Sequence, residues 1–136
     1  MHKKAAVEIF NSSHIPATIV DVVVIKSTVI NSNKKGLQSL LNGYFKAHDN
    51  FTQKDELTLQ LMAARQRLSK VELIKSFNGI LMTGLEENLK LLTGIKPDLY
   101  NTINNLNEIL TTAKLLDTPI ISDNIIENSF LLNSRK

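Results

Sequence analysis

Apolar residues follow two different spacings along the chain, one before residue 31 and another after it. Residues 19–25 read IVDVVVI, in which six β-branched residues surround a single aspartate, Asp21. Val and Ile lose side-chain freedom in a helix and pack well on a pleated surface, so this run predicts a strand. The run is apolar on both faces, which is typical of a strand covered by helices on both sides. Residues 5–10, AAVEIF, predict a shorter strand before it.

From residue 31 onward the apolar residues recur at the three- and four-residue steps of amphipathic helices. Asn31, Ser32 and Asn33 can cap a first helix, which we expect to end near His48. Four further helices are predicted at about residues 53–67, 70–78, 84–92 and 97–116. Two N-terminal strands followed by about five helices place the chain in the α/β class.

The predicted helix starts carry recognisable capping signals. Thr52 can cap the helix at 53–67, and Ser69 with Glu72 matches the capping box that opens the next helix. Thr83 and Glu86 match a second capping box. In the helix at 97–116 the residues predicted to face inward share one apolar stripe: Ile103, Leu106, Ile109, Leu110 and Ala113.

Composition excludes several classes of function. The 136 residues contain no Cys, carry a formal charge of +3 and are 43% hydrophobic, which suits one domain or part of a larger one. No apolar run approaches the roughly 20 residues that span a bilayer, and the N-terminal residues do not form a signal peptide. The three histidines, His2, His14 and His48, share no metal-ligand spacing. Since no catalytic dyad, triad or cofactor motif is found either, we expect no enzyme, no metal and no cofactor.

One segment imitates a DNA-binding motif. Residues 61–77, LMAARQRLSKVELIKSF, have the apolar spacing of a helix-turn-helix, with basic residues that could meet phosphates. Arg67 stands at the turn position that Gly usually holds, and Glu72 lies near the start of the would-be recognition helix. A small DNA-binding or helical interaction protein is therefore the alternative function.

The order of motifs along the chain carries a further signal. An SSHIP segment leads into IVDVVVIK, and a helix with LLNGYFKAHDNF follows. Next come LSKVEL, ILMTGLEENLKLL and the helix LYNTINNLNEIL, which ends before Pro119. This series, above all IPATIVDVVVI and GLEENLKLL, resembles the C-terminal part of the substrate-binding proteins of nitrate/sulfonate/taurine and thiamine-precursor ABC importers. The resemblance covers about residues 7–132.

The resemblance implies part of a type II periplasmic-binding-protein fold, in which two α/β lobes joined by crossover strands enclose a small molecule. The chain is then one region, with residues 1–14 ending the second lobe, 15–30 forming a crossover strand and 31–136 returning to the first lobe. The opening strands of the first lobe and most of the second lobe are missing from this sequence. Half of the cleft is thus absent, and we expect the chain alone to bind ligand weakly.

The resemblance also implies a site and partners. Asp21 would face a ligand amine, and Ile15 and Pro16 would shape the hinge. The ligand would be a small organic molecule of the sulfonate, nitrate, amine or pyrimidine class. The protein partner would be an ABC permease, and nucleic acid would not be a partner. Full-length family members are periplasmic, or extracellular and membrane-associated, and would meet the membrane only through the permease or an anchor that this sequence lacks. The function expected first is therefore solute binding for an ABC importer or a related sensor.

Overall fold

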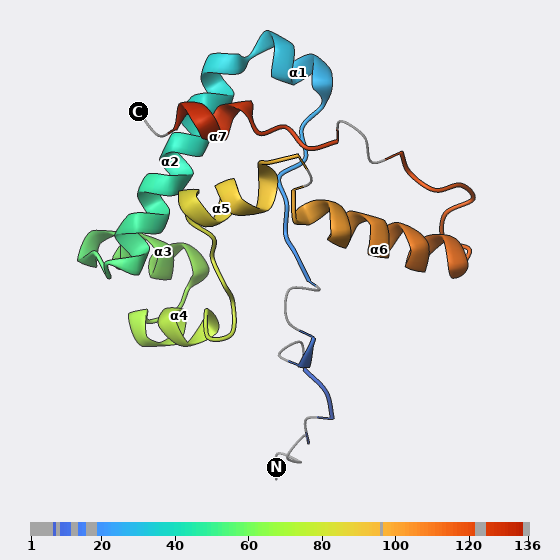
Figure 1. Cartoon of the computed structure of the whole chain (residues 1–136). Coiled ribbons are helices and arrows are strands. Elements are labelled where there is room, and N and C mark those ends of the chain that lie inside the picture. Colours follow the sequence, from blue (N-terminus) through green and yellow to red (C-terminus); the bar gives the residue numbers. More distant parts are fainter. Residues whose placement is uncertain are drawn as a thin grey trace.

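The computed structural model describes residues 7, 9–11, 14, 15, 19–95, 97–121 and 125–134, and this part of the chain contains α-helices and no β-strand (Figure 1). The helices are α1 (Ser27–Ser32), α2 (Lys34–Thr52), α3 (Glu56–Gln66), α4 (Lys70–Ser76), α5 (Leu85–Leu92), α6 (Leu99–Thr112) and α7 (Ser129–Asn133). The helices predicted after residue 31 are therefore present, with shifted ends.

The predicted α/β class, with its two N-terminal strands, is wrong for the described residues. Residues 19–25 form neither helix nor strand, and residues 27–30, which belong to the predicted crossover strand of residues 15–30, begin α1 instead. The predicted strand at 5–10 lies partly outside the described residues. β-propensity measures how well a residue fits a pleated surface, so a β-prone run becomes a strand only where another strand pairs with it. The described part of the chain supplies no such neighbour.

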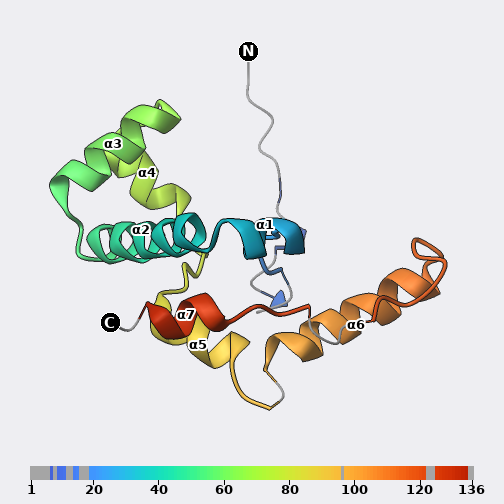
Figure 2. The same ribbon diagram turned by 90° about the horizontal axis from the view of Figure 1, so that it is seen from above.

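α2 is the helix around which α1, α3 and α7 assemble. It packs against α1, α3 and α7, and α7 packs in turn against α5. Seen from above in Figure 2, α1 continues from one end of α2, while α3 and α4 lie over the other end. Leu37 and Phe45 of α2 are buried, on the apolar stripe that the sequence predicts.

Two small hydrophobic clusters hold this arrangement together. The α5–α7 cluster consists of buried Phe45, Leu89 and Leu131, with Leu41, Leu85 and Leu92 packed against it. The α3–α4 cluster consists of buried Leu59, Ala63 and Leu73, with Phe51, Met62 and Phe77 around it. Both clusters are small, and many large apolar side chains of the described residues therefore stay exposed.

The ends of α3 and α4 are fixed by backbone and side-chain hydrogen bonds. The predicted capping box of α4 is confirmed: the Glu72 N–H donates to Ser69 Oγ at 3.2 Å, and the Ser69 N–H donates to Glu72 Oε2 at 2.9 Å. α3 ends at Gln66, and the next residue, Arg67, adopts a left-handed conformation with φ 57°. The Leu68 N–H donates to the Ala63 carbonyl at 3.0 Å, so this end is a Schellman motif in which an arginine takes the usual glycine position.

Two predicted caps are wrong. Thr52 is the last residue of α2, and α3 is capped by Asp55, whose Oδ2 accepts from the Thr58 N–H at 2.8 Å. The N-cap of α5 is Gly84. Thr83 instead accepts a hydrogen bond from the side chain of Asn88 at 3.0 Å. Ser, Thr and Asp all cap well, so local sequence alone does not choose among neighbouring candidates.

Candidate interaction surfaces

α6 stands apart from the other helices. It does not pack extensively against any other helix of the described residues, and both views show it extending away from α2 (Figures 1 and 2). No residue of α6 is buried. The helix ends in a second Schellman motif, in which Lys114 has φ 57° and the Leu115 N–H donates to the Leu110 carbonyl at 2.9 Å.

The segment that follows α6 folds back along one side of it. Asn107 holds this segment with two hydrogen bonds: its Nδ2 donates to the Ile120 carbonyl at 2.7 Å, and its Oδ1 accepts from the Ile120 N–H at 2.9 Å. Ile103 and Leu110 lie three or four residues from Asn107, hence on the same side of the helix, and both are half-buried. The returning segment therefore covers this side of α6.

The neighbouring side of α6 is apolar and uncovered. Leu106 is 52% exposed and Ile109 is 60% exposed, and Ala113, at the C-terminal end of the helix, is exposed as well. These three residues recur at steps of three and four, so they form one stripe, which we call the open face of α6. These residues were predicted to face inward; their helical periodicity is confirmed, but nothing in the described part of the chain covers them.

A second uncovered surface is the extended segment of residues 19–25. Ile19, Val22, Val23 and Val24 are all more than half exposed, and Val24 reaches 86%. Asp21 is exposed within this segment and does not line the pocket between α1, α2 and α7. Ile15, a predicted hinge residue, is also exposed, and Pro16 lies outside the described residues. The ligand-binding role of Asp21 and the hinge role of Ile15 and Pro16 stay predictions.

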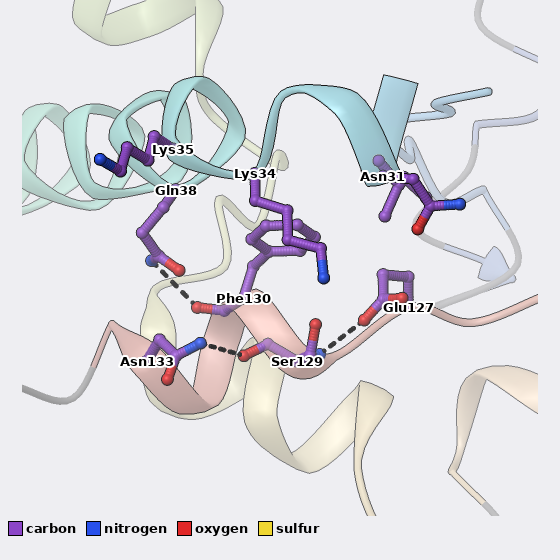
Figure 3. Close-up of a pocket in the computed structure, with 9 residues that line it drawn as sticks. Asn31, Lys34, Lys35, Gln38, Glu127, Ser129, Phe130 and Asn133 are labelled. Atoms are coloured by element: carbon purple, nitrogen blue, oxygen red, sulfur yellow. Dashed lines mark hydrogen bonds between the residues drawn. The ribbon is translucent and has the colours of Figure 1, made fainter. Parts of the chain in front are cut away.

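A pocket of about 520 Å³ lies where α1, α2 and α7 meet (Figure 3). Gln38 donates to the Phe130 carbonyl at 3.1 Å and to Ser134 Oγ at 2.8 Å, which fastens α7 to α2. Hydrogen bonds from Ser129, together with the nearby ammonium of Lys34, hold the pKa of Glu127 below its usual value. These polar groups make contacts that hold the helices together. We therefore interpret the pocket as part of the packing between α1, α2 and α7 and not as a ligand site.

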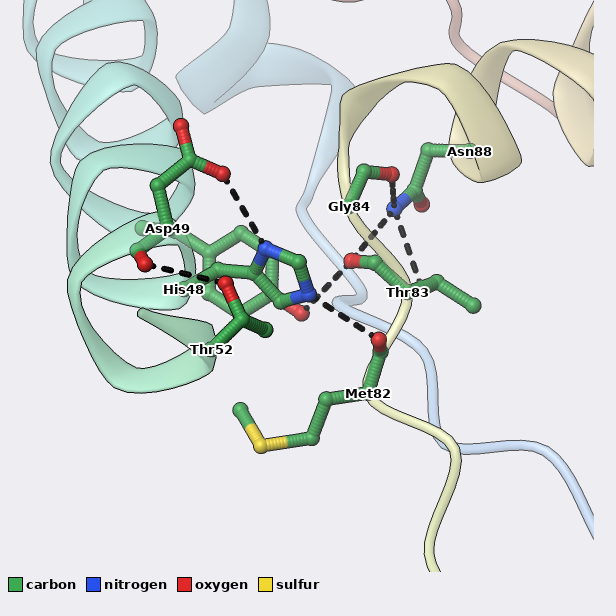
Figure 4. Close-up of polar contacts among 8 residues, drawn as sticks. His48, Asp49, Thr52, Met82, Thr83, Gly84 and Asn88 are labelled. Atoms are coloured by element: carbon green, nitrogen blue, oxygen red, sulfur yellow. Dashed lines mark hydrogen bonds and ion pairs between the residues drawn. The ribbon is translucent and has the colours of Figure 1, made fainter. Parts of the chain in front are cut away.

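A cluster around His48 joins α2 to the connector between α4 and α5 (Figure 4). The His48 side chain is only 11% exposed; its Nε2 lies 3.0 Å from the Met82 carbonyl oxygen and its Nδ1 lies 3.3 Å from Asp49 Oδ1. Tyr44 donates to the Thr83 carbonyl at 3.1 Å. A Cβ atom on Gly84 would lie 2.9 Å from the His48 ring, so glycine permits this close approach. His48 therefore positions the connector, and this role was missed in the sequence.

The segment at residues 61–77 that resembles a helix-turn-helix lies in a pair of packed helices, α3 and α4. α3 and α4 pack closely through Ala63 and Leu73, with Arg67 in the turn. The positive charge of this helix pair is partly neutralised, because the Lys70 ammonium bonds to the Glu56 carboxylate. α4 has only 7 residues and exposes Val71 and Ile74. The exposed basic residues Arg65, Arg67 and Lys75 are thus interspersed with exposed apolar side chains and do not form a continuous basic patch.

Comparisons of the chain with protein-family models, with curated proteins and with solved structures find no match. Within the described residues, no group of three or more His, Cys, Asp or Glu side chains is placed to hold a metal ion. None of the helices described is both long and apolar enough to cross a membrane.

Proposed function

We propose that the chain is a helical interaction protein that binds a macromolecular partner through the open face of α6. The observation that carries this proposal is an amphipathic helix of 14 residues that buries none of them. An amphipathic helix is stabilised chiefly by packing of its apolar face, and the described chain provides cover for only one side of α6.

The composition of α6 strengthens the argument. Seven of its 14 residues are Asn or Thr, which favour a helix poorly. At up to about 0.7 kcal/mol each relative to Ala, these residues together disfavour the helix by at most about 5 kcal/mol. Isolated helices of this length are marginal in water even with good helix formers. Binding of a partner to Leu106, Ile109 and Ala113 would supply the missing packing, so we expect α6 to become more stable when bound.

The proposal replaces solute capture as the leading function. The resemblance to importer binding proteins implies two α/β lobes around a ligand, and the described residues form no sheet; their pocket lies between the helices α1, α2 and α7. Solute binding by a longer parent protein stays a prediction without support from this fold. DNA binding by α3 and α4 is the weaker alternative, because Lys70 is engaged by Glu56 and α4 is short.

Site-specific photocrosslinking in the cells that make the protein tests the proposal. A benzophenone amino acid at Ile109 should give a single adduct of defined mass, which disappears when Leu106→Asp is added. The same group at Asn101, an exposed position on another face of α6, is the matched control and should give no such adduct. Equal adducts from both positions, or none from Ile109, would contradict a partner on the open face.

A further inference from the structure

The turn that follows α4 contains an Asn-Gly pair, Asn78 and Gly79. Both residues are exposed, and Gly79 has φ 85°, in the left-handed region that favours glycine. We propose that this pair is a site of covalent modification, at which Asn78 converts spontaneously to aspartate or isoaspartate and so loosens the connector between α4 and α5. The reaction does not involve α6, so this inference does not depend on the proposed function.

The reaction needs a backbone amide that attacks and a side-chain amide that is attacked. The Gly79 nitrogen bonds to the side-chain carbonyl carbon of Asn78, its proton leaves with the NH2 group as ammonia, and a cyclic succinimide forms. Water, the only co-reactant, then opens the ring at either carbonyl carbon. One opening gives aspartate, and the other gives isoaspartate, in which the main chain runs through the side-chain carboxyl carbon. Glycine hinders the ring closure least, because it has no side chain beside the attacking nitrogen.

The structure leaves both reacting groups of this turn without a hydrogen bond. Among the described residues, none bonds to the Gly79 N–H or to the side chain of Asn78. The backbone on either side is held: the Asn78 N–H donates to the Lys75 carbonyl at 3.1 Å, and the Ile80 N–H donates to the Phe77 carbonyl at 3.0 Å. A Cβ atom on Gly79 would meet no other atom within 4 Å, so the attacking nitrogen has room to move.

The chain contains a second Asn-Gly pair, which the fold protects. Asn42 and Gly43 lie within α2, where each backbone N–H donates to the carbonyl four residues earlier. The Asn42 side chain accepts hydrogen bonds from Gln38 Nε2 at 3.0 Å and from the Ser134 hydroxyl at 2.9 Å. Ring closure at Asn42 therefore requires α2 to open first. Because the dipeptide is the same in both places, a difference in rate reports the fold.

The modified residue would stand between two fixed points of the chain. Phe77 packs against the α3–α4 cluster, and the Met82 carbonyl oxygen lies 3.0 Å from His48 Nε2 (Figure 4). Isoaspartate adds one carbon to the backbone between these points. Either product also places a carboxylate at the C-terminal end of α4, where the helix dipole is negative. We therefore expect the end of α4 and residues 80–83 to detach more often after the modification.

Peptide mass spectrometry of the whole chain, incubated at physiological temperature and neutral pH, tests the reaction. Trypsin releases each Asn-Gly pair in a peptide of its own, residues 36–46 and residues 76–90. Peptide 76–90 should gain about 1 Da, the difference between an amide and an acid. It should do so at least about 10-fold faster than peptide 36–46, because α2 must open first. In guanidinium chloride the two rates should become similar. Equal rates in the folded chain, or no conversion at Asn78, would overturn the proposal.

Hydrogen exchange tests the structural consequence. The modified chain carries one more negative charge, so ion exchange separates it from the fresh chain. Its residues 70–83 should exchange at least about 5-fold faster than those of the fresh chain, while α6 stays unchanged. Asn78→Gln is the matched control, because glutamine closes the corresponding larger ring far more slowly, and the incubated variant should keep the slow exchange. A modified chain that exchanges like the fresh one, or equal acceleration in incubated Asn78→Gln, would overturn the proposal.

Discussion

Leu73 offers the sharpest test of how the helices are held together. It is fully buried, at 0% exposure, between α3 and α4. Leu73→Ala removes three side-chain carbons, one methine and two methyls, a loss of about 2.4 kcal/mol in transfer free energy, and leaves a cavity that adds to this. Phe51 and Phe77 border the cluster, with ring centroids 4.8 Å apart, and can close part of the cavity. We therefore expect a loss of about 3 kcal/mol, or roughly 100-fold in the folding equilibrium of this cluster.

Hydrogen exchange resolved along the chain measures where that loss falls. The α3–α4 cluster shares no residue with the α5–α7 cluster, so Leu73→Ala should accelerate exchange in residues 56–76 much more than in residues 85–92. Val71→Ala is the matched control on the same helix: Val71 is 62% exposed, and its truncation should cost no more than about 0.5 kcal/mol. Equal effects of the two substitutions, or equal acceleration in both regions, would refute the view of two separate clusters.

Two further predictions concern the ends of α3. Arg67→Gly should raise the unfolding free energy by about 1 kcal/mol, and with it the thermal midpoint, because glycine adopts the left-handed conformation without strain. Arg65→Gly, inside the helix, should lower the unfolding free energy by a similar amount. Hydrogen bonds from the backbone N–H and the hydroxyl of Thr58 lower the pKa of Asp55, so its stabilising contribution is complete above its unfolded pKa of about 4 and is lost as pH falls through the lower folded pKa. Asp55→Asn, which still accepts the capping bond but does not titrate, should weaken the fall in thermal midpoint between pH 6 and pH 3; an unchanged fall would rule out Asp55 as a contributor.

The helices were predictable because their signals are local. The three- and four-residue periodicity located α2 to α6, and the Ser69–Glu72 box located the start of α4 to the residue. Both signals act within one or two turns of chain, where propensity and capping operate directly. The error at Thr52 has the same origin, since two adequate N-caps stand three residues apart and tertiary packing decides between them.

The candidate surfaces were only half predictable. Periodicity identifies the apolar side of α6 but does not say whether another element covers Leu106 and Ile109. Residues 19–25 have a high β-propensity, but such a segment forms a sheet only when another strand pairs with it. The two hydrogen bonds between Asn107 and Ile120 decide which side of α6 is covered. No motif or periodicity in the sequence indicates that these two residues pair.

The separation into two clusters also bears on the order in which the chain can fold. The α3–α4 cluster draws all its members from a short stretch between Phe51 and Phe77, so little loop entropy opposes its formation. The α5–α7 cluster requires Phe45 to meet Leu131, from the far end of the described chain. During synthesis the first cluster can close while α7 has not yet been translated. For that interval α2 lacks its contact with α7, and Phe45 and Leu89 remain accessible to chaperones.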